Sequence, residues 1–183
     1  MLNMDFSQRV VIDNRDREWV PSPRPGVWRK PPAREDAERG HATSIVRYDP
    51  GSKFHAHDHP LGEEILVLSG TFSDETGDYP AGTYFRNPEG FRHAPFSEEG
   101  CELLVKLHQF QDDDSAHVVI DTLTTPFQPH THHGGEEIYV IKGELLDENG
   151  HYPAGTWIRS PHLSSHNPYV EQDTLIWVKV GHL

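Results

Sequence analysis

The sequence predicts an all-β protein built from two tandem barrels or sandwiches, and three features of the chain support this prediction. Apolar segments of strand length alternate with short turns rich in glycine and proline. No long stretch combines a helix cap with an apolar stripe of helical period. One segment also repeats itself without a gap at a constant offset of 73 residues, which indicates two copies of one structural unit.

Seven apolar runs rich in valine, isoleucine, leucine and aromatic residues have the length of β-strands. They lie at 43–48, 65–68, 83–85, 103–107, 118–120, 138–141 and 174–180. Turns such as Pro80-Ala81-Gly82 and its counterpart Pro153-Ala154-Gly155 separate them. Many short strands joined by regular turns are typical of sandwiches and barrels. The runs at 63–68 and 136–141 are apolar on both faces, so we expect both faces of these strands to be covered.

The repeat sets the expected domain organisation. Between 57–107 and 130–180, 23 of the 51 aligned pairs are identical. We therefore expect an N-terminal arm over 1–18, a first domain over 19–111 and a second domain over 112–183. The proline-rich stretch at 19–28 cannot form a central strand. Its two tryptophans favour a segment packed over the first barrel.

Charge and cysteine content exclude several function classes. The chain has 29 acidic against 16 basic residues, a net charge of −13, which argues against nucleic acid and anionic membranes as partners. No apolar run is long enough for a transmembrane helix or a signal peptide, so we expect a cytoplasmic protein. The single cysteine, Cys101, excludes an intrachain disulfide and a cysteine-rich zinc finger. We expect its side chain to be buried.

The repeat sorts the 14 histidines, because six of them recur in both copies together with a glutamate. The recurring sets are His57, His59, Glu63 and His93 in the first copy, and His130, His132, Glu136 and His166 in the second. Histidines two residues apart on a strand point the same way, about 6.6 Å apart. A turn before the glutamate returns the chain to the same place. The last histidine would arrive from a later strand.

Three imidazoles and one carboxylate form a metal site suited to Zn, Fe, Mn, Ni or Cu rather than Ca or Mg. One His-x-His pair alone is common on half-exposed strands. The repetition of four residue types at four equal spacings is what predicts two metal sites. The adjacent Glu64 and Glu137 should point to the opposite face of the strand, as surface or hydrogen-bonding carboxylates.

The pattern Gly51-x5-His57-x-His59-x3-Glu63-x6-Gly70 resembles the first motif of the cupin superfamily. The second copy departs from it, because Thr124 stands where the leading glycine would be. The second cupin motif is partly present, and its ligand histidine comes later than in most cupins. This delayed histidine makes the chain resemble the cupin domain of ChrR-type anti-sigma factors. The resemblance implies a double-stranded β-helix, or jelly roll, in each copy, with zinc on three histidines and one glutamate.

One departure limits what the resemblance implies. ChrR-type anti-sigma factors carry a separate helical domain that binds the sigma factor and holds its own zinc through histidine and cysteine ligands. This chain has one cysteine and a proline-rich start, so the sigma-binding activity is not carried over. We expect a metal-binding bicupin with two metals per chain, zinc first and iron next, that binds or senses a small molecule. A homodimer is left open.

Two alternatives remain open. Similar small cupins include iron dioxygenases that cleave C–C bonds beside a carbonyl group, and the second metal could be purely structural. No catalytic residue is assigned, although the recurring Arg86 and Arg159 are candidates to bind a substrate carboxylate if they do not pair on the surface. We expect the first barrel to carry the chemistry, because it has a complete entry segment and a long arm. The segment 163–165 of the second copy, with smaller side chains, argues the other way.

Overall fold

The computed structural model describes residues 1–36, 40–108, 116–124 and 128–183. These residues form β-strands and no helix, so the all-β prediction is confirmed. They accordingly contain no helix of the length and apolarity needed to cross a membrane. The expected boundary between residues 111 and 112 lies outside the described residues. The chain divides into two compact units, Met1–Met4 with Glu18–Phe110 and Asp5–Arg17 with Gln111–Leu183.

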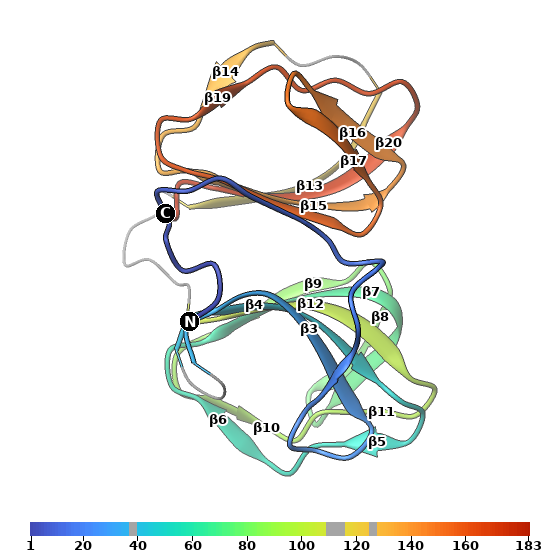
Figure 1. Ribbon diagram of the computed structural model, residues 1–183. Coiled ribbons are helices and arrows are strands. Elements are labelled where there is room, and N and C mark those ends of the chain that lie inside the picture. The colour runs from blue at the N-terminus through green and yellow to red at the C-terminus, as the bar shows by residue number, and fades with distance from the viewer. Residues whose placement is uncertain (37–39, 109–115, 125–127) are drawn as a thin grey trace. The chain divides into compact units, whose positions relative to one another are not determined.

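The first unit is built around a curled sheet, seen in the lower half of Figure 1. Its strand order is β2-β3-β4-β12-β7-β11-β5, with β8 and β9 also paired to β7, while β6 and β10 form a separate ladder. The bounds are β2 Val20–Pro21, β3 Val27–Arg34, β4 Ala42–Tyr48, β5 Ser52–Lys53, β6 His57–His59, β7 Glu63–Asp74, β8 Gly77–Pro80, β9 Tyr84–Asn87, β10 Phe91–His93, β11 Phe96–Ser97 and β12 Cys101–Leu107. Buried apolar side chains of β3, β4, β7 and β12 form its core.

The second unit repeats this plan with fewer strands, and several of them are labelled in the upper half of Figure 1. Its main sheet has the order β1-β18-β15-β20-β13, and β14-β19 and β16-β17 form two-stranded ladders. The bounds are β1 Val10–Asp13, β13 His117–Leu123, β14 His130–Thr131, β15 Glu136–Lys142, β16 Glu144–Asp147, β17 Gly150–Pro153, β18 Thr156–Ser160, β19 Ser165–His166 and β20 Thr174–Val180. Its core comes from β13, β15, β16, β17, β18 and β20.

Equivalent residues occupy equivalent ladder positions in the two units. In the first, Glu63 faces Leu107 across β7 and β12; in the second, Glu136 faces Val180 across β15 and β20. All five residues at 63–67 are buried, as are those at 136–140, so the expected covering of both faces is confirmed. The 73-residue repeat in the sequence is therefore a repeat of strand pairing.

The N-terminal segment differs from the expected arm over 1–18. Residues Asp5–Arg17 belong to the second unit, because β1 forms an antiparallel ladder with β18 in which Ile12 faces Trp157. Sequence periodicity could not show this, because the four-residue strand VVID pairs with a strand distant in sequence and no short turn connects the two. The chain from Glu18 onward belongs to the first unit.

The proline-rich segment contributes more sheet than expected. Strand β2 lies at the sheet edge, where proline is tolerated, but β3 continues through Pro31 and Pro32 and pairs with β4. The ladder shifts register between Lys30 and Ala33. The two prolines, which lack N–H donors, thus sit within the irregularity rather than in regular pairing.

Gly70, the last glycine of the motif, is required by a close approach of two strands. Its φ is +69°, and a Cβ there would lie 2.0 Å from the carbonyl oxygen of Gly100. The register of β12 shifts at this point, between Glu102 and Leu103. Gly143 holds the same place in the second unit, with φ +83°. A side chain at either position would push the strands apart.

Candidate metal centre

In the first unit, strand pairing brings together the histidines that the repeat singled out. His57 and His93 are direct partners in the β6–β10 ladder. His59 lies two residues along β6, on the same face. The turn after β6 is closed by a hydrogen bond from the Gly62 N–H to the His59 carbonyl, and Glu63 begins β7 immediately afterwards. The predicted turn therefore returns the glutamate to the histidines.

The donor atoms of these residues lie at the spacing that a bound metal requires. His59 Nε2 is 3.0 Å from both His57 Nε2 and His93 Nε2. Glu63 Oε1 lies 3.2 Å from His93 Nε2 and 3.4 Å from His59 Nε2. A metal with bonds of about 2.1 Å separates neighbouring ligand atoms by about 3.0 Å in octahedral and about 3.4 Å in tetrahedral geometry. The three imidazoles form the mutually close group, and Glu63 contacts two of them.

Hydrogen bonds on the far side of two rings fix which nitrogen faces the centre. His57 Nδ1 lies 3.0 Å from the His55 carbonyl oxygen, and His93 Nδ1 lies 3.1 Å from Asp74 Oδ2. Both partners only accept, since hydrogen bonds hold the Asp74 carboxyl pKa below its usual range despite burial. Each Nδ1 therefore donates, and the Nε2 of each ring is the nitrogen that faces the centre.

Burial lowers the pKa of two of these imidazoles, His57 and His59, and so favours their neutral, coordinating form. Desolvation, with the neighbouring His57 and His93, lowers the pKa of His59 to about 3. Desolvation also lowers the pKa of His57 and raises that of Glu63. Coordination requires deprotonated imidazole, so these two rings are in the right state near neutral pH. Glu63 also accepts a hydrogen bond of 2.8 Å from Asn87 Nδ2, which holds its Oε1 in place.

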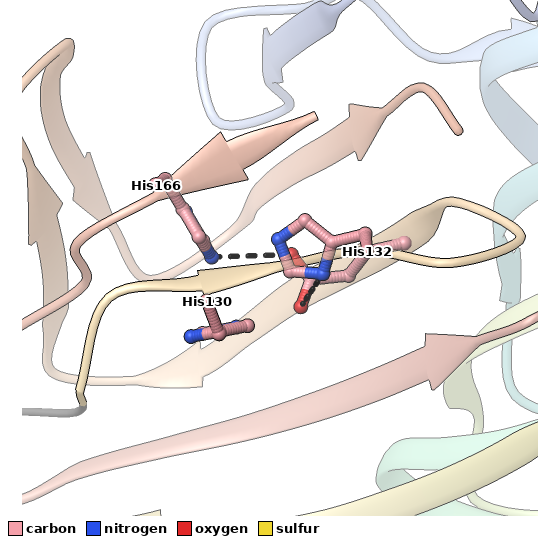
Figure 2. Close-up of side chains that lie close together, drawn as sticks. His130, His132 and His166 are labelled. Carbon is pink, nitrogen blue, oxygen red and sulfur yellow. Dashed lines mark ion pairs between the residues drawn. The ribbon is translucent and has the colours of Figure 1, made fainter. Parts of the chain in front are cut away.

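The second unit assembles the equivalent four residues, and Figure 2 shows its three imidazoles close together. His130 and His166 are direct partners in the β14–β19 ladder. Glu136 Oε1 lies 3.4 Å from His132 Nδ1, and Glu136 Oε2 lies 3.6 Å from His166 Nε2. His132 Nε2, His166 Nε2 and Glu136 Oε2 are buried without a hydrogen-bond partner among the described residues. A cation between them would satisfy all three atoms.

The electrostatics of the second site follow the same causes. Desolvation, with the neighbouring His166 and His130, lowers the pKa of His132 to about 4. Desolvation raises the pKa of Glu136 to about 8, with Arg9 opposing and Asp147 adding to the rise. His130 Nδ1 lies 2.9 Å from the Gln128 carbonyl oxygen. The donor set of each unit thus fits a divalent transition metal.

Sequence reasoning missed the acids that support these ligands. Asp147 stands behind His166, with Oδ2 3.4 Å from Nδ1, as Asp74 stands behind His93. Glu75 and Glu148 each accept a 2.9 Å hydrogen bond from the backbone N–H that follows the last histidine. Both pairs recur at the 73-residue offset, so the repeat carried the signal. Asn87 has Ser160 at the equivalent position of the second copy, so the repeat gave no indication of its role.

The two recurring arginines do not lie at the metal centres. Arg86 faces Glu64 in the β7–β9 ladder, so its side chain lies on the face opposite Glu63, and its Nε is 3.7 Å from Glu64 Oε1. Arg159 stacks on the rings of Phe6 and Trp157. Arg86 pairs with an acid and is half exposed, as the surface alternative expected, whereas Arg159 is fully buried opposite Glu137. Neither position supports a role beside the metal ligands. Strand alternation, which separates the faces of adjacent residues, is the reason.

Two other expectations concern buried side chains. Glu64 and Glu137 are 3% and 2% exposed, so they are not surface carboxylates. Trp157 Nε1 donates a 3.4 Å hydrogen bond to Glu137 Oε2, which agrees with the expected hydrogen-bonding role. Cys101 is buried as expected, and desolvation raises the pKa of its thiol to about 11. A thiol with so high a pKa is a poor nucleophile and metal ligand.

Each candidate centre opens into a cavity, and the two cavities differ in size. The first has a volume of about 850 Å³ and is lined by His57, His59, Glu63 and His93 together with side chains of β3, β4, β7 and β12. The second has a volume of about 200 Å³ and is lined by His130, Glu136 and His166 with mostly apolar side chains. The first is large enough for a small organic molecule.

Solved structures support the fold. A putative dioxygenase from Nostoc punctiforme aligns with a TM-score of 0.79 and 14% identity over 95% of this chain and 82% of its own. A bacterial pirin, YhhW of Escherichia coli in complex with nickel(II), aligns with a TM-score of 0.72 and 11% identity over 94% of this chain and 98% of its own. A variant oxalate decarboxylase from Bacillus subtilis aligns with a TM-score of 0.65 and 13% identity over 93% of this chain and 76% of its own. At these identities the likeness shows the fold.

Sequence comparison gives the family. No curated protein matches the chain by sequence. A family model described as the ChrR Cupin-like domain matches residues 7–111 and again residues 122–183. The two matches agree with the two copies of the repeat and with the cupin fold of each set of ladders. The chain therefore belongs to the ChrR cupin-like domain family.

Proposed function

We propose that the protein binds one divalent transition metal in each unit, with zinc the first candidate and iron the second. The ligands would be His57, His59, Glu63 and His93 in the first unit and His130, His132, Glu136 and His166 in the second. The observation that carries this proposal is the convergence of the Nε2 atoms of three histidines in the first unit, where His59 Nε2 lies 3.0 Å from each of the other two. Lone pairs so close to a carboxylate repel one another unless a cation lies between them.

The first unit is the proposed small-molecule site. A six-coordinate metal held by four side chains keeps two positions open, and a bound metal would supply a Lewis acid to polarise ligand oxygens. The protein contributes a cavity of about 850 Å³ beside the ligands. Asn87 and Asp74 hold Glu63 and His93 in place. In the second unit, with about 200 Å³, the metal would mainly connect β14, β15 and β19.

Metal content of untagged protein tests the ligand assignment. After loading with zinc and gel filtration, the parent should hold two equivalents, His59→Ala one, His132→Ala one and the double variant none. His55→Ala and His133→Ala are matched controls, because they remove neighbouring histidines that do not recur in the repeat. These controls should keep both equivalents.

Two results would contradict the proposal. The ligand set is wrong if His59→Ala still holds two equivalents. Metal binding itself is wrong if the parent holds none after loading with zinc, iron, manganese or nickel. Circular dichroism of each variant separates loss of ligand from loss of fold.

A second candidate is an iron-dependent dioxygenase that cleaves the C–C bond beside a carbonyl group. The observation that favours it is the fold similarity to the putative dioxygenase from Nostoc punctiforme, combined with the cavity beside the first centre. Zinc cannot change its oxidation state, so this activity would require a redox-active metal such as iron. In such a reaction both atoms of O2 enter the two products.

Oxygen uptake decides between binding and catalysis. Iron-loaded protein is assayed with small β-dicarbonyl and hydroxyketone compounds, together with Glu63→Ala and Glu136→Ala. If the first unit is catalytic, Glu63→Ala loses uptake and Glu136→Ala keeps it. Loss in Glu136→Ala alone would assign the chemistry to the second unit, and no uptake by the parent favours a binding or sensing role.

A further inference from the structure

Strand β13 lies at one edge of the second sheet, where the first sheet has an additional strand. Ala42 of β4 pairs with Leu107 as His117 of β13 pairs with Val180, so the two strands hold equivalent places. In the first unit β3 pairs with the other side of β4. No described strand pairs with the other side of β13. The edge that β3 covers in one unit is therefore open, among the described residues, in the other.

Exposure follows this difference in pairing. Six of the seven residues of β4 are buried, against one of seven in β13. Val119 is 51% exposed and Ile120 38%, which is high for β-branched residues in the middle of a strand. The segment His117–Leu123 contains no proline and no lysine, the residues with which edge strands commonly resist pairing. An exposed apolar edge without this protection favours pairing with a further strand.

The direction of the backbone groups in β13 follows from one hydrogen bond at the end of β20. The Gly181 N–H donates to the Gly135 carbonyl oxygen, toward β15, so the preceding residue Val180 faces β13. Its ladder partner His117 then faces β20, as does every second residue after it. The residues whose N–H and C=O groups point away from the sheet are Val118, Ile120 and Thr122. The Thr122 N–H agrees with this direction, because it donates to Asp121 Oδ1 at 2.7 Å.

We propose that two copies of the chain associate through the outer edges of their β13 strands, paired antiparallel with Val119 at the twofold axis. In this register Val118 faces Ile120 of the second copy, and the two exchange both backbone hydrogen bonds. His117 faces Asp121 of the second copy at a position without backbone bonds, where opposite side chains lie closest. This imidazole–carboxylate pair forms twice, because a twofold interface repeats every contact.

Neighbouring registers fit the same strand less well. With Ile120 at the axis, the ladder would require the Thr122 N–H, which already donates to Asp121. With Asp121 at the axis, two carboxylates would face each other, which is destabilising. The strand is therefore complementary to itself in charge and in its outward backbone groups when Val119 lies at the axis. This self-complementarity favours a second copy over an unrelated strand.

The association would also affect the second cavity. Val119 and Asp121 line this cavity. In the paired strands the Val119 side chains of the two copies lie side by side on this face of the sheet. Each copy thus extends the wall of the other's second cavity, as β3 extends the wall of the first cavity within its own unit. The inference does not rest on the proposed metal binding.

The ladder is short, so the association should depend on concentration. One seven-residue strand edge offers little surface compared with the about 1,200–2,000 Å² that stable complexes bury. Sedimentation velocity of the parent from about 1 to about 500 µM should therefore show a rising dimer fraction. A parent that remains monomeric over this range overturns the inference.

Ile120→Pro tests the edge itself, because it removes an outward N–H donor and leaves the bonds of the β13–β20 ladder in place. It should weaken dimerisation roughly tenfold or more. Val11→Pro is the matched control at the opposite edge of the same sheet. Val11 is 39% exposed, and its N–H points outward because the Asn14 N–H donates toward β18, to the Gly155 carbonyl oxygen.

The control should dimerise as the parent does. The inference is overturned if Ile120→Pro, shown to be folded by circular dichroism, dimerises as tightly as the parent. If Ile120→Pro fails to fold, Ile120→Lys takes its place, since it keeps the backbone donor and adds a charge that edge strands use against pairing.

An introduced cysteine tests the register. Val119→Cys places two thiols at the twofold axis, where facing Cα atoms lie about 4.5 Å apart, within reach of a disulfide. Diamide, which oxidises two thiols to a disulfide, should link Val119→Cys into a covalent dimer. Val11→Cys and the parent, whose single Cys101 is buried, should stay unlinked. Val119→Cys that stays unlinked at concentrations where the parent is dimeric would overturn the proposed pairing.

Discussion

The two units place the same ligands on the same ladders, yet they provide very different space around them. His57 faces His93 in the first unit as His130 faces His166 in the second. The cavities beside them measure about 850 and about 200 Å³. The lining of the first cavity includes residues from outside the repeat, among them Arg24, Arg29 and Arg34. The comparison teaches that the repeat carries the candidate metal ligands, while the N-terminal chain adds wall residues to the first cavity alone.

The N-terminal chain extends the two sheets at opposite edges. In the first unit β3 pairs with β4 and brings Arg29 into the cavity wall. The counterpart of β4 is β13, which is the outermost described strand on its side of the second sheet. There the added strand, β1, pairs with β18 at the other edge. The extra strand therefore lines a cavity in one unit and not in the other.

A second difference concerns the aspartate behind the last histidine. Asp74 Oδ2 lies 3.1 Å from His93 Nδ1. Asp147 Oδ2 lies 3.4 Å from His166 Nδ1 and also forms an ion pair with Arg9 Nη2 at 3.1 Å. Arg9 Nη2 further donates a hydrogen bond of 2.7 Å to the hydroxyl of Tyr152. The second site thus has a permanent positive charge close by, which should weaken its attraction for a cation.

The largest expected effect comes from the supporting aspartates. Asp74→Asn should lower zinc affinity of the first site by about 10- to 100-fold, because the carboxylate that polarises His93 is lost. Asp147→Asn should have a smaller effect, since Arg9 already neutralises that carboxylate. Competition titration with a chromophoric chelator measures both, using His132→Ala and His59→Ala backgrounds to isolate each site. Equal losses of zinc affinity in Asp74→Asn and Asp147→Asn would contradict the proposed effect of Arg9 on Asp147.

The pH dependence of the metal-free protein should show the next largest effect. The folded-state pKa of His59, about 3, lies below its unfolded value near 6.5. Between these values the unfolded chain binds the proton and the folded chain does not, so stability falls as pH falls below 6.5. On going from pH 7 to pH 5, the parent should lose about 1–2 kcal/mol more than His59→Gln.

Urea unfolding of chelator-treated protein at the two pH values measures this difference. The variant is the reference for titrating groups distant from His59, so the difference reports His59 together with its interactions with His57 and His93. A parent and variant with equal pH slopes would show that His59 titrates normally in the folded state. His132→Gln gives the matching comparison for the second unit, where the folded-state pKa of His132 is about 4.

The smallest expected effect sharpens the role of Arg9. Arg9→Met should raise zinc affinity of the second site by about two- to fivefold, because a nearby positive charge is removed. The first site should not change. Arg15→Met is the control, since it removes a more exposed arginine of the same segment. A lower affinity at the second site would mean that Arg9 positions Asp147 rather than competing with His166.

The repeat made the ligands predictable from sequence, and it could also have revealed Asp74 and Asp147. Four residue types at fixed spacings leave few arrangements on strands, because alternation decides which side chains share a face. The same rule placed Arg86 away from the metal once the register with Glu64 was known. Register between strands distant in sequence is not encoded locally, so this exclusion required the structure.

The N-terminal chain was the least predictable part. Strand β1 pairs with β18, more than a hundred residues away, and nothing in its four residues names that partner. Arg29 lies among prolines, in a segment that composition alone marks as irregular. Its inward direction follows from its pairing with Val46 of β4. Residues outside the repeat have no aligned counterpart in the chain, so no comparison of two copies could indicate their role.

The most direct test of the account asks which metal centre a small molecule can reach. His132→Ala and His59→Ala, loaded with one equivalent of cobalt(II), each report on a single centre through the visible spectrum. Acetohydroxamate, a small ligand with two oxygen donors, is then added to each. The account predicts a spectral change at the first centre, in His132→Ala, and little or none at the second, in His59→Ala. A change in His59→Ala alone, or in neither variant, would contradict it.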